Sequence, residues 1–143
     1  MDHASPAARG LARWHDCVAR RDFAALADLL ADDVRFHSPF LWRPKEGKAI
    51  TLAYLTAAIH VLGSFAYHRA MTDGTSWTLE FGAKVGEFAL KGVDIIRFGD
   101  DGRIVDFEVM VRPFKGLQAL AEAMQKQLAA QGVAGQRRRS DRM

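Results

Sequence analysis

The sequence has very little cysteine: Cys17 is the only one in 143 residues. A single cysteine cannot form an internal disulfide, which excludes the disulfide-rich class of small secreted domains and fits a reducing compartment. The first residues also lack a basic segment followed by an apolar run, so they predict no secretory signal. We therefore expect a cytoplasmic protein.

Long hydrophobic runs and metal-ligand spacings are missing too. The longest apolar stretch, residues 49–63, is interrupted by Thr51, Thr56 and His60 and is shorter than the ~20 residues of a membrane-spanning helix. The five histidines are scattered, and no phosphate loop or nucleophile motif occurs. The sequence therefore predicts no membrane partner, no metal and no cofactor.

The net charge of +3 belongs to the end of the chain. Residues 137–143 hold four of the 20 Lys and Arg and one of the 17 Asp and Glu, which leaves 16 of each sign in residues 1–136. We expect residues 132–143 to form a disordered basic tail, because they contain almost nothing apolar to bury. With the charge confined to this tail, we expect no nucleic-acid partner.

Hydrophobic periodicity predicts helices around a run of strands. Apolar residues at helical spacing predict helices over about 6–21, after the N-cap Asp22, over 48–62 with a cap at Gly63, and over about 115–131. Alternation predicts a short strand that Pro39 ends, and then antiparallel strands over 64–72, 75–85, 87–99 and 102–112.

This order of elements predicts one domain of the α+β class. We expect an extension over residues 1–7 and a single domain over 8–131, in which the helices cover one face of the sheet. Glycines within and between the strands should bend the sheet into a half-cone around the helices; they are Gly82, Gly86, Gly92 and Gly99. A cone has an inside, and we expect a ligand there.

Two segments resemble a known family. They are LADLLADDVRFHSP at residues 26–39 and VDIIRFGDDGRIVDF at residues 93–107. Together they make about residues 8–114 similar to the nuclear transport factor 2-like superfamily, which includes the ketosteroid isomerases and the SnoaL-like polyketide cyclases. The resemblance implies a cone-shaped, cystatin-like α+β roll.

The chemical groups of ketosteroid isomerase are only partly present. That enzyme uses a carboxylate base with a tyrosine and a protonated aspartate as hydrogen-bond donors. By the resemblance, the base position is Ser38, the tyrosine position is Trp14, and the donor position keeps Asp94. The resemblance therefore does not imply a standard ketosteroid isomerase.

Asp94 and His37 are the candidate catalytic residues. Asp94 interrupts an apolar strand and shares a face with Leu90 and Ile96, so burial should raise its pKa and make it an acid or hydrogen-bond donor. The alternative is an aspartate satisfied by neighbouring groups, without chemistry. His37 lies beside the lost base position, but alternation points it away from Phe36 and Ser38, which favours a structural role.

Aromatic residues are plentiful, and most should pack the core. Phe40 and Trp42 lie on a loop, where exposed aromatic side chains often close over a ligand or partner. Cys17 follows Trp14 by one helical turn and could line the cavity, although a small buried thiol is the default. The candidate ligand-binding residues are Trp14, Cys17, Ser38, Phe40, Trp42, Tyr54, Tyr67, Trp77, Ile96, Phe107 and Val109.

The outer sheet face should carry Glu80, Arg97, Glu108 and Arg112 together with apolar residues such as Met110. Relatives commonly dimerise through this face, so we expect a homodimer; the alternative is a monomer whose last helix covers the face.

The functional expectation is a SnoaL-like protein that binds a small hydrophobic ligand, such as a cyclic carbonyl compound, with isomerase, lyase or cyclase chemistry by proton transfer. A non-catalytic ligand-binding or protein-interaction module is the alternative.

Overall fold

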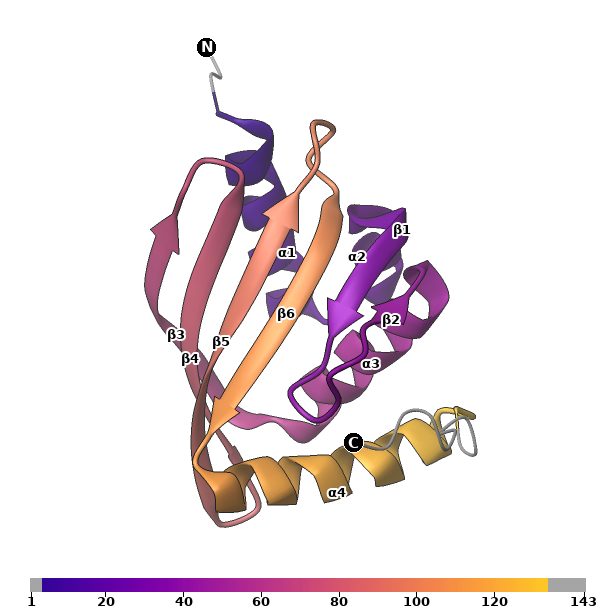
Figure 1. Cartoon of the computed structure of the whole chain (residues 1–143), viewed down its shortest axis with the longest axis vertical. Coiled ribbons are helices and arrows are strands. Elements are labelled where there is room, and N and C mark those ends of the chain that lie inside the picture. Colours follow the sequence, from indigo (N-terminus) through magenta and orange to yellow (C-terminus); the bar gives the residue numbers. More distant parts are fainter. Residues whose placement is uncertain (1–3, 134–143) are drawn as a thin grey trace.

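A six-stranded sheet carries helices on one of its two faces in the computed structural model, which describes residues 4–133 (Figure 1). The helices are α1 (Pro6–Arg20), α2 (Phe23–Leu29), α3 (Lys48–Val61) and α4 (Phe114–Ala130). The strands are β1 (Leu30–His37), β2 (Lys45–Glu46), β3 (Gly63–Thr72), β4 (Ser76–Val85), β5 (Phe88–Phe98) and β6 (Ile104–Arg112). The predicted fold class is confirmed, and the helix and strand bounds lie close to those expected.

Local capping sets the two N-terminal helices. The Ser5 hydroxyl accepts a hydrogen bond from the Ala8 backbone N–H, and proline occupies the first turn of α1. Arg21 ends α1 in the left-handed conformation, with φ 52°. Asp22 then caps α2 by accepting from the Ala25 N–H, as the sequence predicted. The two helices are thereby joined by a connection of two residues.

The strand order is β2-β1-β6-β5-β4-β3. Strands β3 to β6 form the predicted antiparallel meander, whereas β1 pairs with β6 in parallel. A parallel neighbour needs a long crossover connection, and α3 supplies part of it. Gly63 does not cap α3: Leu62 is the C-cap in an extended conformation, and Gly63 already begins β3.

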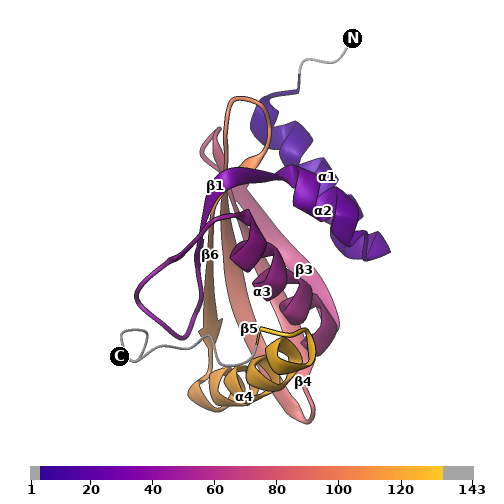
Figure 2. The same ribbon diagram turned by 90° about the vertical axis from the view of Figure 1, so that its right-hand side faces the viewer.

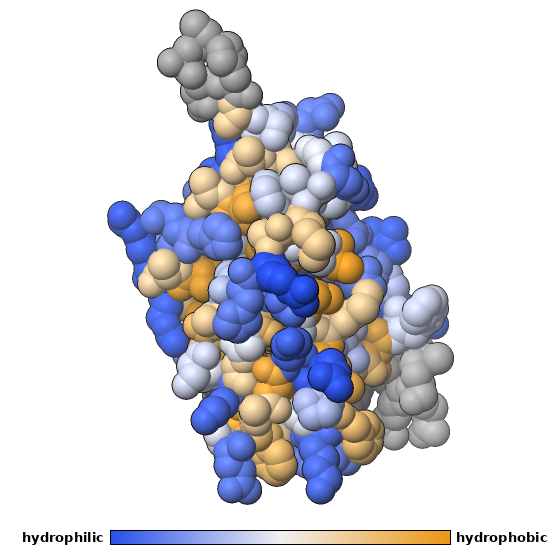
Figure 3. Space-filling model, turned by 90° about the vertical axis from the view of Figure 1, so that its left-hand side faces the viewer, coloured by the Kyte–Doolittle hydropathy of each residue, from blue (hydrophilic) through white to orange (hydrophobic). Residues whose placement is uncertain are grey.

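β3 forms one edge of the sheet. Exposed polar residues such as His68, Arg69 and Thr72 interrupt it, which is how natural sheets discourage edge-to-edge pairing. The side of the molecule that carries this edge accordingly mixes hydrophilic and hydrophobic residues, without one large apolar area (Figure 3).

Close packing on the inner face of the sheet depends on Gly92. A Cβ added there would lie 2.5 Å from the ring of Phe81 and would also collide with the carbonyl oxygen of Met110. The absence of a side chain at this position therefore lets β5 approach the Phe81 ring on β4 and the backbone of β6. The inner residues of β4, β5 and β6 join α1, α2 and α3 in the core.

Helix α4 lies across one end of the sheet, on the same side as α3 (Figure 2). Its buried residues Leu120 and Met124 pack against a group of core residues that includes Phe81 and Leu90. The outer face is therefore not covered by this helix, and the alternative of a helix-covered face is wrong. None of the described helices is long and apolar enough to cross a membrane. The expected basic tail lies outside the described residues from position 134 onward.

Candidate functional site

A cavity of about 400 Å³ lies between the inner face of the sheet and the helices. Residues of α1, α3, α4 and the strands line it, and most of them are apolar. Asp94 and Arg21 are the charged residues among the lining side chains that the structure describes. A pocket of this size and polarity is typical of small-molecule sites.

Three side chains from three elements form a hydrogen-bonded chain in this cavity. The Trp14 Nε1–H on α1 donates to the Tyr67 hydroxyl oxygen on β3 over 3.0 Å. The Tyr67 hydroxyl donates to Asp94 Oδ2 on β5 over 2.6 Å. An indole N–H can only donate, so it fixes Tyr67 as its acceptor and directs the single tyrosine O–H to Asp94.

The hydrogen bonds from Trp14 to Tyr67 and from Tyr67 to Asp94 leave one oxygen of Asp94 for a ligand. No side chain of the described residues forms a hydrogen bond with Oδ1, and Asp94 lines the cavity although only 6% of its surface is exposed. A ligand that enters the cavity can therefore form a hydrogen bond with this oxygen.

Burial controls the ionisation of the pair. Desolvation raises the pKa of Asp94 from 3.8 to about 7, and the hydrogen bond from Tyr67 opposes this increase only in part. Burial, together with the neighbouring carboxyl, raises the pKa of Tyr67 well above its usual 10. Tyr67 therefore stays protonated, while Asp94 can gain or lose its proton near neutral pH.

Most of the expected ligand-binding residues line the cavity. They are Trp14, Ser38, Phe40, Tyr54, Tyr67, Phe107 and Val109, with Asp94. Ser38 has a structural task as well, since its Oγ accepts hydrogen bonds from the Phe40 and Leu41 N–H groups, both 3.3 Å long. The residue at the family's base position thus holds the loop that follows β1.

Four of the expected ligand-binding residues are not among the cavity-lining side chains. Cys17 and Ile96 are buried in the core cluster, and Trp77 packs against it. Trp42 is 85% exposed on the loop after β1, so it does not close over the cavity in this structure. Its bulky neighbour Phe40, two residues earlier, takes the cavity position instead.

His37 points to the outer face of the sheet. Its Nε2 lies 3.0 Å from Asp106 Oδ1 on β6, while the flanking Phe36 and Ser38 line the cavity. This is the alternation expected of a strand, so the bulge that would bring His37 inside is not formed. His37 cannot reach a ligand bound at Asp94, and a role as catalytic base is dropped. The described residues contain no group of three metal-ligating side chains either.

The bond between Tyr67 and Asp94 was not expected from the sequence. The two residues lie on β3 and β5 with β4 between them, and the register of β3 shifts between Tyr67 and Ala70. That irregularity is not visible in the apolar pattern. Tyr67 was among the expected ligand-binding residues and lines the cavity, but the sequence alone does not identify its partner.

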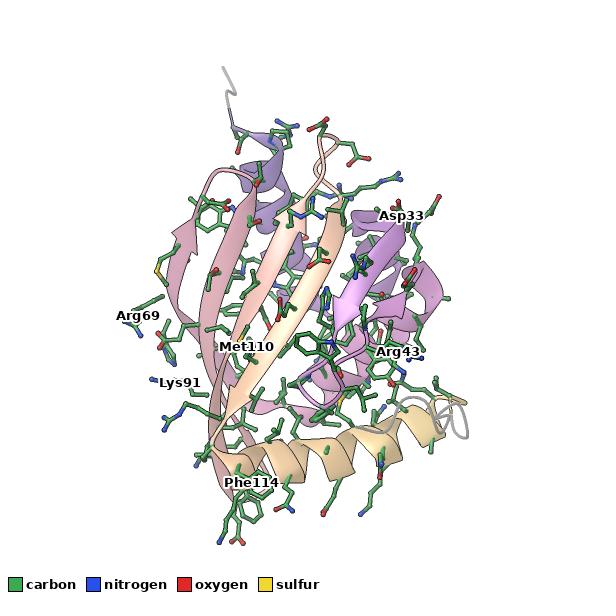
Figure 4. All side chains as sticks on the ribbon, viewed as in Figure 1. Asp33, Arg43, Arg69, Lys91, Met110 and Phe114 are labelled. Atoms are coloured by element: carbon green, nitrogen blue, oxygen red, sulfur yellow. The ribbon has the colours of Figure 1, made fainter. Side chains whose placement is uncertain are left out.

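The outer face of the same strands is organised differently. Glu80 on β4 accepts two hydrogen bonds from Arg69, of 2.6 and 2.8 Å, and lies 3.4 Å from Lys91 Nζ. These cations hold the pKa of Glu80 down at about 2. Met110 is half exposed on this face, beside Val93 (Figure 4).

The family model of the SnoaL-like domain matches residues 11–107. The chain belongs to this family, within the nuclear transport factor 2-like superfamily, and the expected family is confirmed. A search of the curated proteins found no match.

Solved structures agree with this assignment. A steroid delta-isomerase from Pseudomonas aeruginosa is 50% identical, with a TM-score of 0.87 over 92% of this chain and 97% of that one. A protein with a cystatin-like fold from Silicibacter pomeroyi is 38% identical, with a TM-score of 0.80 over 86% and 87% of the two chains. A nuclear transport factor 2-like protein from Mesorhizobium loti shares the fold at 20% identity and a TM-score of 0.68, over 79% of this chain and 96% of that one.

Proposed function

We propose that the cavity binds a small hydrophobic carbonyl compound and that Asp94 exchanges a proton with it, in an isomerase or lyase reaction. The observation that carries this proposal is a carboxyl buried in an apolar cavity, with a pKa of about 7 and one oxygen without a protein partner. The relation to a protein described as a steroid delta-isomerase supports the same reaction class.

Asp94 acts in both of its protonation states. In the protonated form, Oδ2 accepts from Tyr67 and Oδ1–H donates to the carbonyl oxygen of the ligand. In the ionised form, the same carboxylate can take a proton from the carbon next to the carbonyl and return it elsewhere. A pKa near the working pH suits both tasks. Tyr67 does not touch the reacting atoms in this scheme and serves as a positioning residue.

Binding is tested by thermal-shift titration with neutral cyclic ketones, on the wild type and on Asp94→Leu and Asp94→Asn. We expect ketone affinity to fall about tenfold or more in Asp94→Leu, because a hydrogen bond to a buried polar group is lost. Asp94→Asn should keep binding, since its amide N–H₂ can donate in place of the carboxyl. Equal affinity in all three proteins would show that Asp94 takes no part in binding.

A non-catalytic ligand-binding module is the second candidate. Two observations favour it. Ser38 stands at the family's base position, and Asp94 is the only lining residue in the described part of the chain whose pKa is raised to about 7. Incorporation of deuterium from D₂O next to the ketone carbonyl, followed by NMR, separates the two candidates. The enzyme should exchange this position and Asp94→Asn should not, whereas binding without exchange by the wild type would favour the module.

We also propose a homodimer through the outer face of the sheet. Val93, Ile95 and Met110 give that face an apolar centre beside the charges of Glu80 and its partners, and the loop after β1 projects on the same side (Figure 2). In sedimentation velocity, Met110→Glu should shift dimer to monomer. Phe114→Glu is the matched control, because Phe114 is 72% exposed at the start of α4, away from this face (Figure 4). A monomeric wild type would contradict the proposal.

A further inference from the structure

The exposed part of the cavity lining lies between the end of α1 and the start of β3. Four of the lining residues are exposed, namely Ala19, Arg21, Gly63 and Ser64, and all others are buried or partly buried. Ile59 and Leu62, at the end of α3, complete this rim. We call this group of six residues the mouth. A ligand that reaches Asp94 through the mouth must pass Arg21.

Arg21 is the cation of the mouth, and no described carboxylate neutralises it. Its Nη2 donates only a long hydrogen bond, of 3.4 Å, to the Ile59 carbonyl oxygen. The neighbouring Arg20 points elsewhere and pairs with Asp16 at 3.0 Å. Asp22, on the other side, uses its side chain to cap α2. The guanidinium therefore keeps most of its donors for another partner.

The backbone at the mouth is held in an unfavourable conformation. Arg21 and Ser64 have φ values of 52° and 50°, and they are the only non-glycine residues of the described chain with positive φ. Glycine is the residue that usually fills this position after a helix, because a Cβ costs energy there. An arginine at a position that favours glycine indicates that its side chain has a use. Strained residues of this kind concentrate at ligand clamps.

We infer that the ligand is a hydrophobic keto acid, whose anionic group binds Arg21 at the mouth while its carbonyl binds Asp94 inside. This inference rests on the proposed function, since it assigns the second end of the same ligand. The chemistry of the cavity fits an amphipathic molecule of this kind: a hydrogen-bond donor inside, apolar walls between, and a guanidinium suited to a carboxylate at the rim.

The test uses ω-oxo-ω-phenyl alkanoic acids of increasing chain length, each compared with its neutral methyl ester. Binding is measured by isothermal titration at about pH 6, where Asp94 is protonated and the probe carboxylate is ionised. Wild-type protein should bind the acid about twofold to fivefold more tightly than the ester, which is the range of an exposed ion pair. The preference should peak at one chain length, because only one length reaches both Arg21 and Asp94.

Two variants of Arg21 distinguish the loss of its charge from a loss of folding stability. Arg21→Gln and Arg21→Gly should both bring the ratio of acid affinity to ester affinity close to one. Arg21→Gly should be at least as thermally stable as wild type, because glycine relieves the positive φ. Arg20→Gln is the matched control, since it removes a neighbouring charge that does not line the cavity.

The possible results distinguish this inference from the proposed function. Equal binding of acid and ester by the wild type, or an acid preference that survives in both Arg21 variants, would overturn the inference and leave the carbonyl site standing. Failure of acids and esters alike to bind the wild type would overturn the proposed function together with the inference.

Discussion

Two carboxyl groups on the two faces of the β4–β5 pair show how burial and charge act in opposite directions. Leu79 pairs with Asp94 and the next residue, Glu80, pairs with Val93, so the carboxyls are close along the strands but point to opposite faces. The inner one has its pKa raised to about 7 by desolvation. The outer one, bonded by Arg69 and Lys91, has its pKa lowered to about 2.

The two carboxyl groups differ in whether they can change protonation near neutral pH. A group that changes protonation near pH 7 can exchange a proton with a ligand, whereas a carboxylate with a pKa of about 2 stays ionised. Glu80 with Arg69 and Lys91 therefore forms an ionic cluster on the outer face, while Asp94 is the inner carboxyl that can change its protonation near pH 7.

Replacing glycine by alanine should give the largest difference in stability between the two faces. Gly92→Ala places a methyl group against the Phe81 ring and the Met110 carbonyl oxygen, and a backbone atom cannot rotate away. We expect it to lower the free energy of unfolding by about 3 kcal/mol or more. Gly82→Ala on the outer face meets only the end of the His68 ring, at 3.1 Å, and should cost less than about 1 kcal/mol.

Urea denaturation of both variants, followed by tryptophan fluorescence, measures this difference. Equal loss of stability would mean that the inner face is no more tightly packed than the outer one.

Asp94→Asn should change how stability depends on pH. Folding raises the pKa of Asp94 from its usual 3.8 to about 7, so between about pH 4 and 7 the folded state holds a proton that the unfolded state has released. The stability of the wild type should therefore be complete below about pH 4 and decrease as the pH rises through about 7. Asparagine has no proton to lose and should remove this decrease.

At pH 8 we expect Asp94→Asn to be more stable than the wild type by about 2 kcal/mol. The shift of roughly three pH units corresponds to about 4 kcal/mol, and burying the amide still costs part of that amount. Urea midpoints at about pH 4 and pH 8 provide the measurement. Parallel pH profiles for both proteins would indicate that the Asp94 carboxyl is ionised in the folded protein.

The fold was predictable because its signals are local. Asp22 as an N-cap, the turn glycines Gly74, Gly86 and Gly102, and the alternation along β5 each fix a feature within a few residues. The two segments that resemble the family, residues 26–39 and 93–107, predicted how these elements are arranged. The same alternation correctly placed Asp94 and Ser38 inside and His37 outside.

The rest of the site depends on relations between distant segments. Tyr67 and Asp94 lie on strands separated by β4, and Trp14 donates to that tyrosine from a helix 53 residues away. Arg21 looks like one more exposed charge in the sequence, and its position at the mouth follows from the meeting of α1, α3 and β3. Trp42 was expected to bind the ligand but is exposed, since an aromatic residue on a loop need not face the cavity.

Glu80→Gln should have the smallest effect and the opposite pH dependence. Because the pKa of Glu80 is lowered from 4.5 to about 2 on folding, its stabilising effect is complete above about pH 4.5 and is lost as the pH falls toward 2. The variant should therefore be slightly less stable than the wild type at pH 7 and equal to it near pH 2. Arg69 is 75% exposed, so the difference should also shrink in high salt. Thermal melts at both pH values and two salt concentrations test this. A difference that persists in high salt and grows with protein concentration would instead place Glu80 in the proposed dimer interface, where solvent no longer screens its pair with Arg69.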